Sequence, residues 1–233
     1  MEDYKVSDFR YELKMECEQI LMPQVQSWVK LHPAGFREAF PPRRVNSVYL
    51  DTFALDTLND HIEGVPVRRK FRFRWYGEDL GNARGQFEIK NKNERVGWKI
   101  TQPVHLLFHL QSTSWAGIQR QMAVYLQNMR SNLFLELLRV SRPLVLISYL
   151  RKYYISGDGL IRLTIDSHQT AFDQWMTVYP NISFRQPGPD LLVVEFKSDV
   201  SNARDMADML AEFPLRTRRH SKFVSAVSSI MER

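Results

Sequence analysis

Five segments of the chain alternate between charged and apolar residues, one position at a time. Because side chains in a β-strand point to opposite faces in turn, this pattern predicts strands with one charged and one apolar face. In residues 67–76, the cations Lys70, Arg72 and Arg74 share one face. Phe71 and Phe73 share the other. The five segments are residues 6–16, 67–76, 86–92, 161–166 and 191–197.

The rest of the pattern predicts further strands, helices and loops. Ile118, Met122 and Tyr125 illustrate the helical spacing of apolar residues that marks the longest helix. Strands are expected at 45–51, 143–154 and 160–172, and helices at 18–31, 54–62, 103–110, 118–138, 203–212 and 221–230. Loops are expected at 41–44 and 77–85, and an irregular segment at 175–189.

The charged faces carry mostly arginine and lysine, with one acid on most strands: Glu12, Glu88, Asp166 and Glu195. An ordinary sheet with one wet face would also alternate, but it would mix lysine, glutamate, serine and threonine. Helices between the strands must also cover apolar surface. A closed or nearly closed antiparallel barrel, charged inside and covered by helices outside, meets both demands and leaves no sheet edge. Such a lumen suits a phosphate-rich ligand with a divalent metal.

The composition indicates a class of binding partner and a cellular compartment. The formal net charge of +6 indicates an anionic partner without identifying it. The single cysteine, Cys17, excludes an internal disulfide and is typical of a reducing compartment. The sequence begins without a signal-peptide pattern, and no apolar run approaches the length of a membrane span. We therefore expect a soluble, cytoplasmic protein with residues 1–233 in one domain.

Eight short motifs follow one another from Arg10 to Phe223. They are Arg10-Tyr11-Glu12-Leu13-Lys14, Ser47-Val48-Tyr49-Leu50-Asp51-Thr52, Lys70-Phe71-Arg72-Phe73-Arg74-Trp75-Tyr76-Gly77, Phe87-Glu88-Ile89-Lys90, Tyr149-Leu150-Arg151-Lys152-Tyr153-Tyr154, Ile161-Arg162-Leu163-Thr164-Ile165-Asp166, Val194-Glu195-Phe196-Lys197 and Ser221-Lys222-Phe223. In this order the chain resembles the VTC domain, the polyphosphate polymerase branch of the triphosphate tunnel metalloenzyme or CYTH-like superfamily. The resemblance implies an α+β fold, an antiparallel eight-stranded tunnel β-barrel with a charged lumen, surrounded by helices.

The resemblance also implies a reaction and its residues. ATP and inorganic polyphosphate would bind in the basic tunnel, where the γ-phosphoryl group of ATP passes to the polymer and ADP leaves. Glu195 would be the principal ligand of a divalent metal (Mn or Mg), and Glu12 and Glu88 match further acids of the superfamily. The phosphates would be bound by Lys14, Arg72, Arg74, Lys90, Arg151, Arg162, Lys197 and Lys222. Fixed cations and a metal suit phosphoryl transfer, which needs alignment and neutralised charge.

The chain departs from the family pattern at two positions. Arg10 stands where CYTH phosphatases have the first acid of their Glu-x-Glu-x-Lys strand, which favours the polymerase branch. Phe223 stands in place of a tyrosine, so any contact of that hydroxyl is lost. An inorganic triphosphatase or CYTH-like phosphohydrolase and a non-catalytic polyphosphate-binding module remain alternatives.

The sequence also bears on other partners. We expect no nucleic-acid partner, since Phe71 and Phe73 face away from Arg72, whereas single-strand platforms place rings and charges on one face. If polymer export is part of the biology, a separate membrane protein would have to provide it. The sequence leaves the oligomeric state open.

Other polar residues offer weaker candidates. His105 and His109 lie four apart on a predicted helix, a spacing that metals can use, but no third ligand is evident and packing or surface roles are favoured. Several arginines outside the motifs either line the tunnel mouth or are solvated loop charges. They are Arg43, Arg44, Arg216, Arg218 and Arg219.

Overall fold

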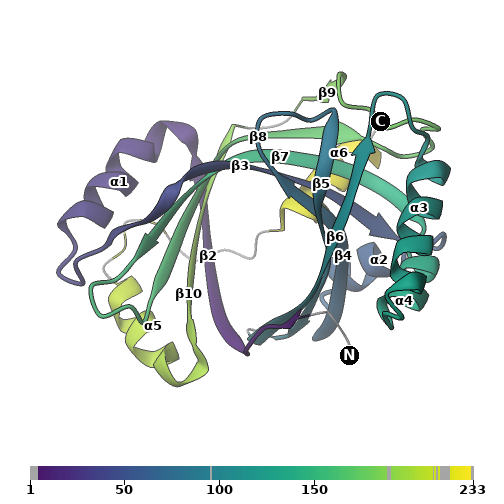
Figure 1. The fold of residues 1–233 in the computed structure, drawn as a ribbon. Coiled ribbons are helices and arrows are strands. Elements are labelled where there is room, and N and C mark those ends of the chain that lie inside the picture. The colour runs from purple at the N-terminus through teal and green to yellow at the C-terminus, as the bar shows by residue number, and fades with distance from the viewer. Residues whose placement is uncertain are drawn as a thin grey trace.

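Eight β-strands form an antiparallel ring in the computed structural model, which describes residues 5–94, 96–187, 190–211, 213, 215 and 221–231 (Figure 1). The order around the ring is β2 (Arg10–Glu18), β10 (Leu191–Asp199), β8 (Arg162–Asp173), β7 (Arg142–Ile155), β3 (Arg37–Asp51), β4 (Val67–Tyr76), β5 (Asn82–Asn93) and β6 (Val96–His109). The ring closes where Arg10 and Tyr11 of β2 pair with Gly97 and Val96 of β6. The expected eight-stranded α+β tunnel fold is confirmed.

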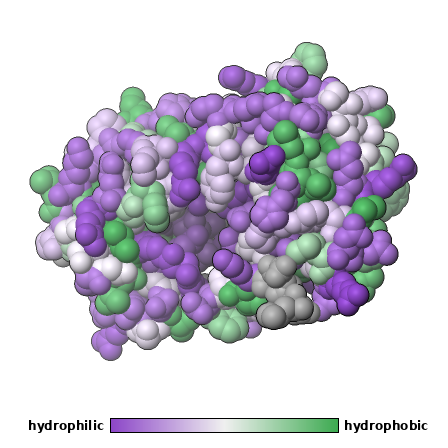
Figure 2. Space-filling view, viewed as in Figure 1, coloured by the Kyte–Doolittle hydropathy of each residue, from purple (hydrophilic) through white to green (hydrophobic). Residues whose placement is uncertain are grey.

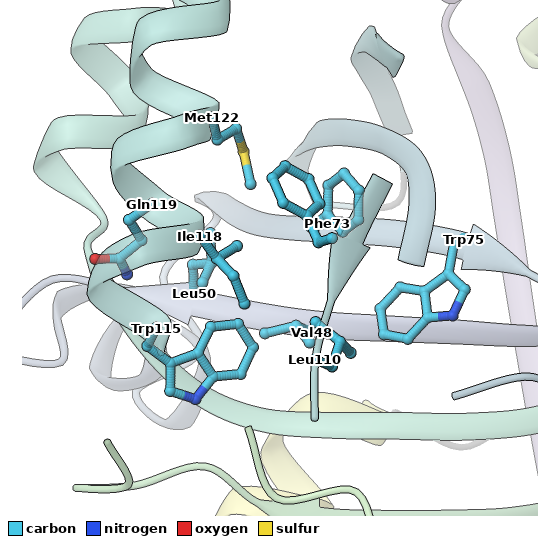
Figure 3. Close-up of a pocket in the computed structure, with 10 residues that line it drawn as sticks. Val48, Leu50, Phe73, Trp75, Leu110, Trp115, Ile118, Gln119 and Met122 are labelled. Atoms are coloured by element: carbon cyan, nitrogen blue, oxygen red, sulfur yellow. The ribbon is translucent and has the colours of Figure 1, made fainter. Parts of the chain in front are cut away.

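One outer wall of the ring packs against a pair of helices, α3 (Trp115–Asn128) and α4 (Leu133–Arg139). The apolar faces of β4 and β5 supply Phe73, Trp75 and Phe87, all buried. The Ser114 hydroxyl caps α3 by accepting a hydrogen bond from the Gly117 backbone N–H at 3.2 Å. Under α3 lies a cavity of about 20 Å³ with an apolar lining, a packing gap in this core (Figure 3).

The opposite outer wall packs against α1 (Met22–Leu31) and α5 (Ala203–Ala211), so the two helical layers flank the ring (Figure 1). Phe196 of β10 is fully buried there, and the Trp28 ring meets it edge-on with ring centroids 6.0 Å apart. The alternation of β10 therefore separates Phe196, which faces the helices, from Glu195 and Lys197, which face the lumen.

A third apolar cluster lies on the lumen side and fills part of the ring. It joins α6 (Lys222–Met231) and α2 (Asp56–Ile62) to β3 and β7. Phe223 of α6 is buried and stacks on Tyr49 of β3 with ring centroids 5.1 Å apart. The remaining short elements are β1 (Lys5–Val6), β9 (Arg185–Gln186) and the 3-10 helices Gln19–Leu21 and Val200–Asn202.

The predicted helix at residues 103–110 is wrong, because this segment is the second half of β6. Val104 and Phe108 are buried at a spacing that suits either a helix turn or a strand. Pairing with β5 from Asn82 to Asn93 decides for the strand. The helical spacing of His105 and His109 disappears, since four strand residues span roughly 13 Å. Both side chains are exposed, and His109 Nδ1 lies 2.8 Å from Asn82 Oδ1.

Other boundaries also differ from the predictions. The predicted loop 41–44 belongs to β3, where register shifts around Pro41-Pro42 accommodate the missing N–H groups. The predicted helix 118–138 is two helices, with Arg130 at a positive φ of 51° between them. β5 begins at Asn82, so its hairpin loop is shorter than expected, and the predicted strand 6–16 is split between β1 and β2. The predicted end of the helix at residue 212 lies outside the described residues.

Candidate active site

The charged faces of the strands line the inside of the ring. Figure 2 shows this face of the molecule hollowed at its centre, with hydrophilic residues around the hollow. On neighbouring strands, Lys14 lies opposite Glu195 and Glu12 lies opposite Lys197. Directly opposite residues of an antiparallel pair share a face. All four therefore point into the lumen.

Glu12 and Glu195 sit among three lysines. Lys90 Nζ donates to both carboxylate oxygens of Glu12, at 2.7 and 2.9 Å. Lys197 Nζ lies 3.0 Å from Glu195 Oε2 and 3.7 Å from Glu12 Oε1, so this ammonium bridges the two acids. Lys14 Nζ lies 2.9 Å from Glu195 Oε1. The chain thus brings together charges from β2, β5 and β10 that are far apart in sequence.

Glu88 is the centre of a second charged group, on β4, β5 and β6. Its carboxylate is fully buried and accepts hydrogen bonds from Arg72 Nε at 2.5 Å and from Lys99 Nζ at 2.7 Å. Arg74 Nη1 lies 3.8 Å away, and Gln86 Nε2 donates at 2.6 Å. Both guanidinium groups are therefore held in fixed orientations facing the lumen.

Asp166 is the centre of a third group, which joins β7, β8 and α6. Arg151 donates to its two oxygens at 2.5 and 2.7 Å, a bidentate pair that fixes the guanidinium plane. Lys222 Nζ lies 2.7 Å from Asp166 Oδ2 and 5.0 Å from the centroid of the Tyr149 ring. Tyr149 also accepts a hydrogen bond from Arg74 Nη2 at 3.2 Å, which links this group to the second one.

Lys70 occupies the lumen beside the N-terminus of α6. Its ammonium donates to Ser221 Oγ at 2.7 Å and lies 5.6 Å from the centroid of the Phe223 ring. Ser221 Oγ also accepts from the Val224 backbone N–H at 3.2 Å, so it caps α6. Among the described residues, Lys70 has no carboxylate within ion-pair distance.

The excess of positive charge shifts pKa values across the lumen. Burial alone would raise the pKa of Glu12, but Lys90 and Lys197 lower it to about 2. Asp166 is lowered against burial in the same way, to a pKa of about 2, by Arg151 and Lys222. Burial and repulsion from Lys14 and Lys90 hold the pKa of Lys70 well below its ordinary value. Burial and the nearby Lys70 lower the pKa of His61 to about 3, so this imidazole is neutral.

Arg162 lies apart from the three charged groups, at one end of the tunnel. It is opposite Lys197 and Ile155 on the neighbouring strands, which places it on the lumen face, but its side chain is exposed. It lines a cavity of about 610 Å³ together with residues from β3, the β7–β8 hairpin and β10. We call this end of the ring the tunnel mouth; its lining includes Arg37, Phe40, Ile155, Arg162 and Asp199.

The structure describes two of the five predicted arginines outside the motifs. Arg43 lies near this mouth, within 5.5 Å of three aromatic ring centroids. Arg44 forms an ion pair with Glu78 at 3.1 Å. Arg216, Arg218 and Arg219, by contrast, lie outside the described residues.

The acids of the lumen fit a hard divalent cation at one place. Glu195 Oε1 is buried and lies 2.9 Å from Lys14 Nζ, and Thr164 Oγ1, on the paired strand position, is buried without a hydrogen bond from the described residues. Glu12 is close enough to Glu195 for its pKa to respond to that charge. Mg²⁺ is commonly held by one or two carboxylates plus substrate phosphates. No three His, Cys, Asp or Glu side chains gather as a metal site in the described part of the chain, so phosphate oxygens would complete the coordination.

The carboxylate of Glu88 is engaged by Arg72, Lys99 and Gln86, whereas Glu12 and Glu195 are engaged mainly by lysines. Its contacts are those of a counter-ion that orients cations. Its assignment as a metal ligand stays a prediction, as do the roles of the other predicted site residues.

The structure adds lumen residues that the motifs did not identify as site residues. Lys99 of β6 pairs with Glu88 of β5. Because the sequence pattern predicts a helix for the second half of β6, the pairing of β6 with β5 could not be predicted. Asp166 belongs to a motif, but only its contacts show that it holds Arg151 and Lys222 together. Lys70 alternates with Arg72 and Arg74 along β4, and this alternation predicts that its side chain shares their face.

A closed antiparallel ring with cations facing inward defines a triphosphate-tunnel fold. A family model of the VTC domain matches residues 9–231. The chain therefore belongs to the VTC domain family. A search of curated proteins found no match.

Two solved structures illustrate the fold likeness. HpAC1 from Hippeastrum, a candidate adenylyl cyclase with a dominant triphosphatase activity, aligns with a TM-score of 0.55 and 13% identity over 95% of this chain and 96% of its own. A candidate adenylate cyclase from Vibrio parahaemolyticus aligns with a TM-score of 0.48 and 12% identity over 93% and 97%. The first supports the fold alone, and the second is too distant to add to it. None of the helices in the described residues is long and apolar enough to cross a membrane.

Proposed function

We propose that the chain is a metal-dependent phosphotransferase that passes the γ-phosphoryl group of ATP to an inorganic polyphosphate chain inside the tunnel. The observation that carries the proposal is the lumen itself, where cations outnumber the carboxylates that hold them. Arg72, Arg74 and Arg151 are buried or nearly so and fixed by Glu88 and Asp166. A polyanion would supply the missing negative charge without any rearrangement of these groups.

The proposed roles follow from where each group lies. Arg74, Arg151 and Lys222 all contact Tyr149, so a phosphate chain beside this ring would meet fixed donors from two strands and α6. Lys14, Lys90 and Lys197 would bind the phosphates nearest to Glu12 and Glu195. Those two acids would hold a divalent metal (Mn or Mg), which when bound neutralises charge on the phosphate oxygens. Arg162 would contact phosphates only at the tunnel mouth.

A triphosphatase is the second candidate. The Hippeastrum neighbour is described by a dominant triphosphatase activity, and the same cations and acids would serve hydrolysis. Arg10 at the start of β2 favours the polymerase, because the phosphatases of the superfamily have an acid at that position. A non-catalytic polyphosphate binder would need the same cations and no turnover.

Product analysis separates the three functions. The purified protein is incubated with ATP and either Mn²⁺ or Mg²⁺, and polyphosphate, ADP and free phosphate are quantified. Polymer with a matching amount of ADP is expected. Free phosphate without polymer would reject the polymerase activity and support a triphosphatase activity. Tight polyphosphate binding without turnover would leave only the binding module.

Glu195→Gln tests the proposed metal ligand. The substitution keeps the shape of the side chain but removes the charge, so turnover should fall at least about 100-fold while the fold is retained. The measurement is the rate of ADP release at increasing Mn²⁺ or Mg²⁺, with circular dichroism as the folding check. Glu136→Gln, whose carboxylate pairs with Arg69 on the outer wall, is the matched control and should leave the rate unchanged. Full activity of Glu195→Gln would remove Glu195 from the metal site.

The proposal takes residues 1–233 as one tunnel domain in the cytoplasm, with ATP and polyphosphate as its partners and no nucleic acid. A separate membrane protein for polymer export remains a hypothesis. Co-purification of the tagged chain from membranes would support such a partner, and its recovery in the soluble fraction without one would argue against it.

A further inference from the structure

Arg43 is held between three aromatic rings near the tunnel mouth. Its guanidinium carbon lies 4.9 Å from the centroid of Tyr153, 5.2 Å from Tyr76 and 5.5 Å from Phe40. These distances are typical of cation–π contacts. Arg43 forms no ion pair with the described residues, and Phe40 and Tyr76 are 57% and 46% exposed. The group therefore presents open ring surface and an unneutralised guanidinium to solvent.

The strand register places this group on the lumen face. Arg43 lies opposite Arg151, and Phe40 lies opposite Tyr153. Tyr153 follows Arg151 by two residues on β7, and Tyr76 follows Arg74 by two residues on β4, so each ring lies roughly 7 Å beyond a phosphate-facing arginine. Phe40 also lines the cavity at the mouth. The rings thus continue the line of tunnel cations outward.

A bare polyphosphate chain has no group that would use these rings. An organic triphosphate does, because its phosphates would lie among the tunnel cations while its organic part projects toward the mouth. A flat, uncharged group stacks on aromatic rings and on a guanidinium plane. A cationic organic group would be repelled by Arg43. These requirements describe the base of a nucleotide.

Building on the proposed function, in which ATP is the phosphoryl donor, we propose that Phe40, Arg43, Tyr76 and Tyr153 form the subsite for its nucleobase. The base stacks on the exposed rings, and Arg43 lies between the rings and the phosphate-binding cations. Stacking is tolerant of base identity, so the subsite distinguishes nucleotides from bare phosphate chains more than one base from another.

The test compares two ligands on ring-deleted protein. Phe40→Ser with Tyr76→Ser removes two exposed rings and leaves every tunnel charge in place. Binding of ATP and of tripolyphosphate is measured by calorimetry in EDTA, where turnover is prevented. ATP affinity should fall about 10-fold, the lower end of the loss for a stacked base, while tripolyphosphate affinity stays within about 2-fold.

Two comparisons make the result decisive. Phe184→Ser removes an 82% exposed ring near β9, at the other end of β8 from Arg162, and should change neither affinity. Tyr76→Ser alone serves if the double variant does not fold by circular dichroism, with about a 3-fold loss for ATP expected. Equal losses for both ligands, or none for ATP, would overturn the subsite. If the wild type binds neither ligand, the proposed tunnel function itself fails.

Discussion

The two faces of β4 carry two different kinds of chemistry. On the outer face, Phe71, Phe73 and Trp75 are buried against the helical layer and make the fold. On the inner face, Arg72 and Arg74 are held by Glu88, and Lys70 has no described carboxylate partner. Burying apolar side chains stabilises the fold, whereas burying cations costs desolvation energy that an ion pair only partly offsets. The inner face therefore costs stability, which the proposed function explains by the ligand that it would bind.

The same separation holds for arginines. Arg69, between Arg68 and Lys70, faces outward and pairs with Glu136 of α4 at 2.8 Å. Arg72, three residues later, faces inward and pairs with Glu88 at 2.5 Å. Both are Arg–Glu pairs on one strand, but the outer pair is partly exposed and the inner carboxylate is fully buried. Only the inner pair lies in the lumen, where the proposed function places the polyanion.

The largest expected effect comes from breaking the outer face. Phe73→Ala should lower the free energy of unfolding by about 3–5 kcal/mol, because removal of this buried ring leaves a cavity that adds to the existing gap under α3. Urea unfolding followed by fluorescence measures the change. Molecules that remain folded should bind tripolyphosphate with nearly wild-type affinity, since no lumen group is altered. A large loss of affinity with unchanged stability would contradict the division between the faces.

The next effect comes from exchanging the inner ion pair for amides. Arg72→Gln with Glu88→Gln removes both partners and leaves the net lumen charge unchanged, while Lys99 and Arg74 also lose the carboxylate beside them. Tripolyphosphate affinity, measured by calorimetry in EDTA, should still fall about 10- to 100-fold because a fixed charged donor is lost.

The matched control is the outer pair. Arg69→Gln with Glu136→Gln should change the free energy of unfolding by at most about 1 kcal/mol, as expected of a partly exposed ion pair, and leave the affinity unchanged. If the two double variants lose affinity equally, the inner pair has no special role in binding.

The contrast between the two faces also explains which parts of the fold and of the candidate site can be predicted from the sequence. Period-2 alternation predicts the strands of β2, β4 and β10 and assigns Arg72 and Phe73 to opposite faces. It fails at β6, since Val104 and Phe108 also satisfy a helical spacing and only hydrogen bonding to β5 decides between the two. Contacts between distant strands, such as Lys90 with Glu12, depend on the stagger of the closed ring, which no local pattern contains. The aromatic group around Arg43 could not be predicted because its rings come from three different strands. In addition, the sequence pattern predicts a loop at residues 41–44.

The smallest effect is a pH dependence that belongs to Lys70. Burial and the charges of Lys14, Lys90, Lys92 and Arg68 hold its pKa well below the ordinary lysine value in the free protein. His61 is neutral at neutral pH, so it adds no charge there. A polyanion in the lumen would favour the protonated ammonium, and binding should therefore take up a proton.

The sign of the effect follows from linkage. Because the pKa of Lys70 is lower in the free than in the bound protein, tripolyphosphate affinity should fall as the pH rises between these two values. Lys70→Gln should flatten this slope and bind more weakly at low pH, where the wild-type ammonium is charged. The titration of tripolyphosphate itself is common to both proteins, so the difference between their slopes isolates Lys70. Lys152→Gln changes a lysine on the outer face of β7 and should keep the wild-type slope. Parallel slopes for the wild type and Lys70→Gln would mean that Lys70 is not a ligand-linked proton site.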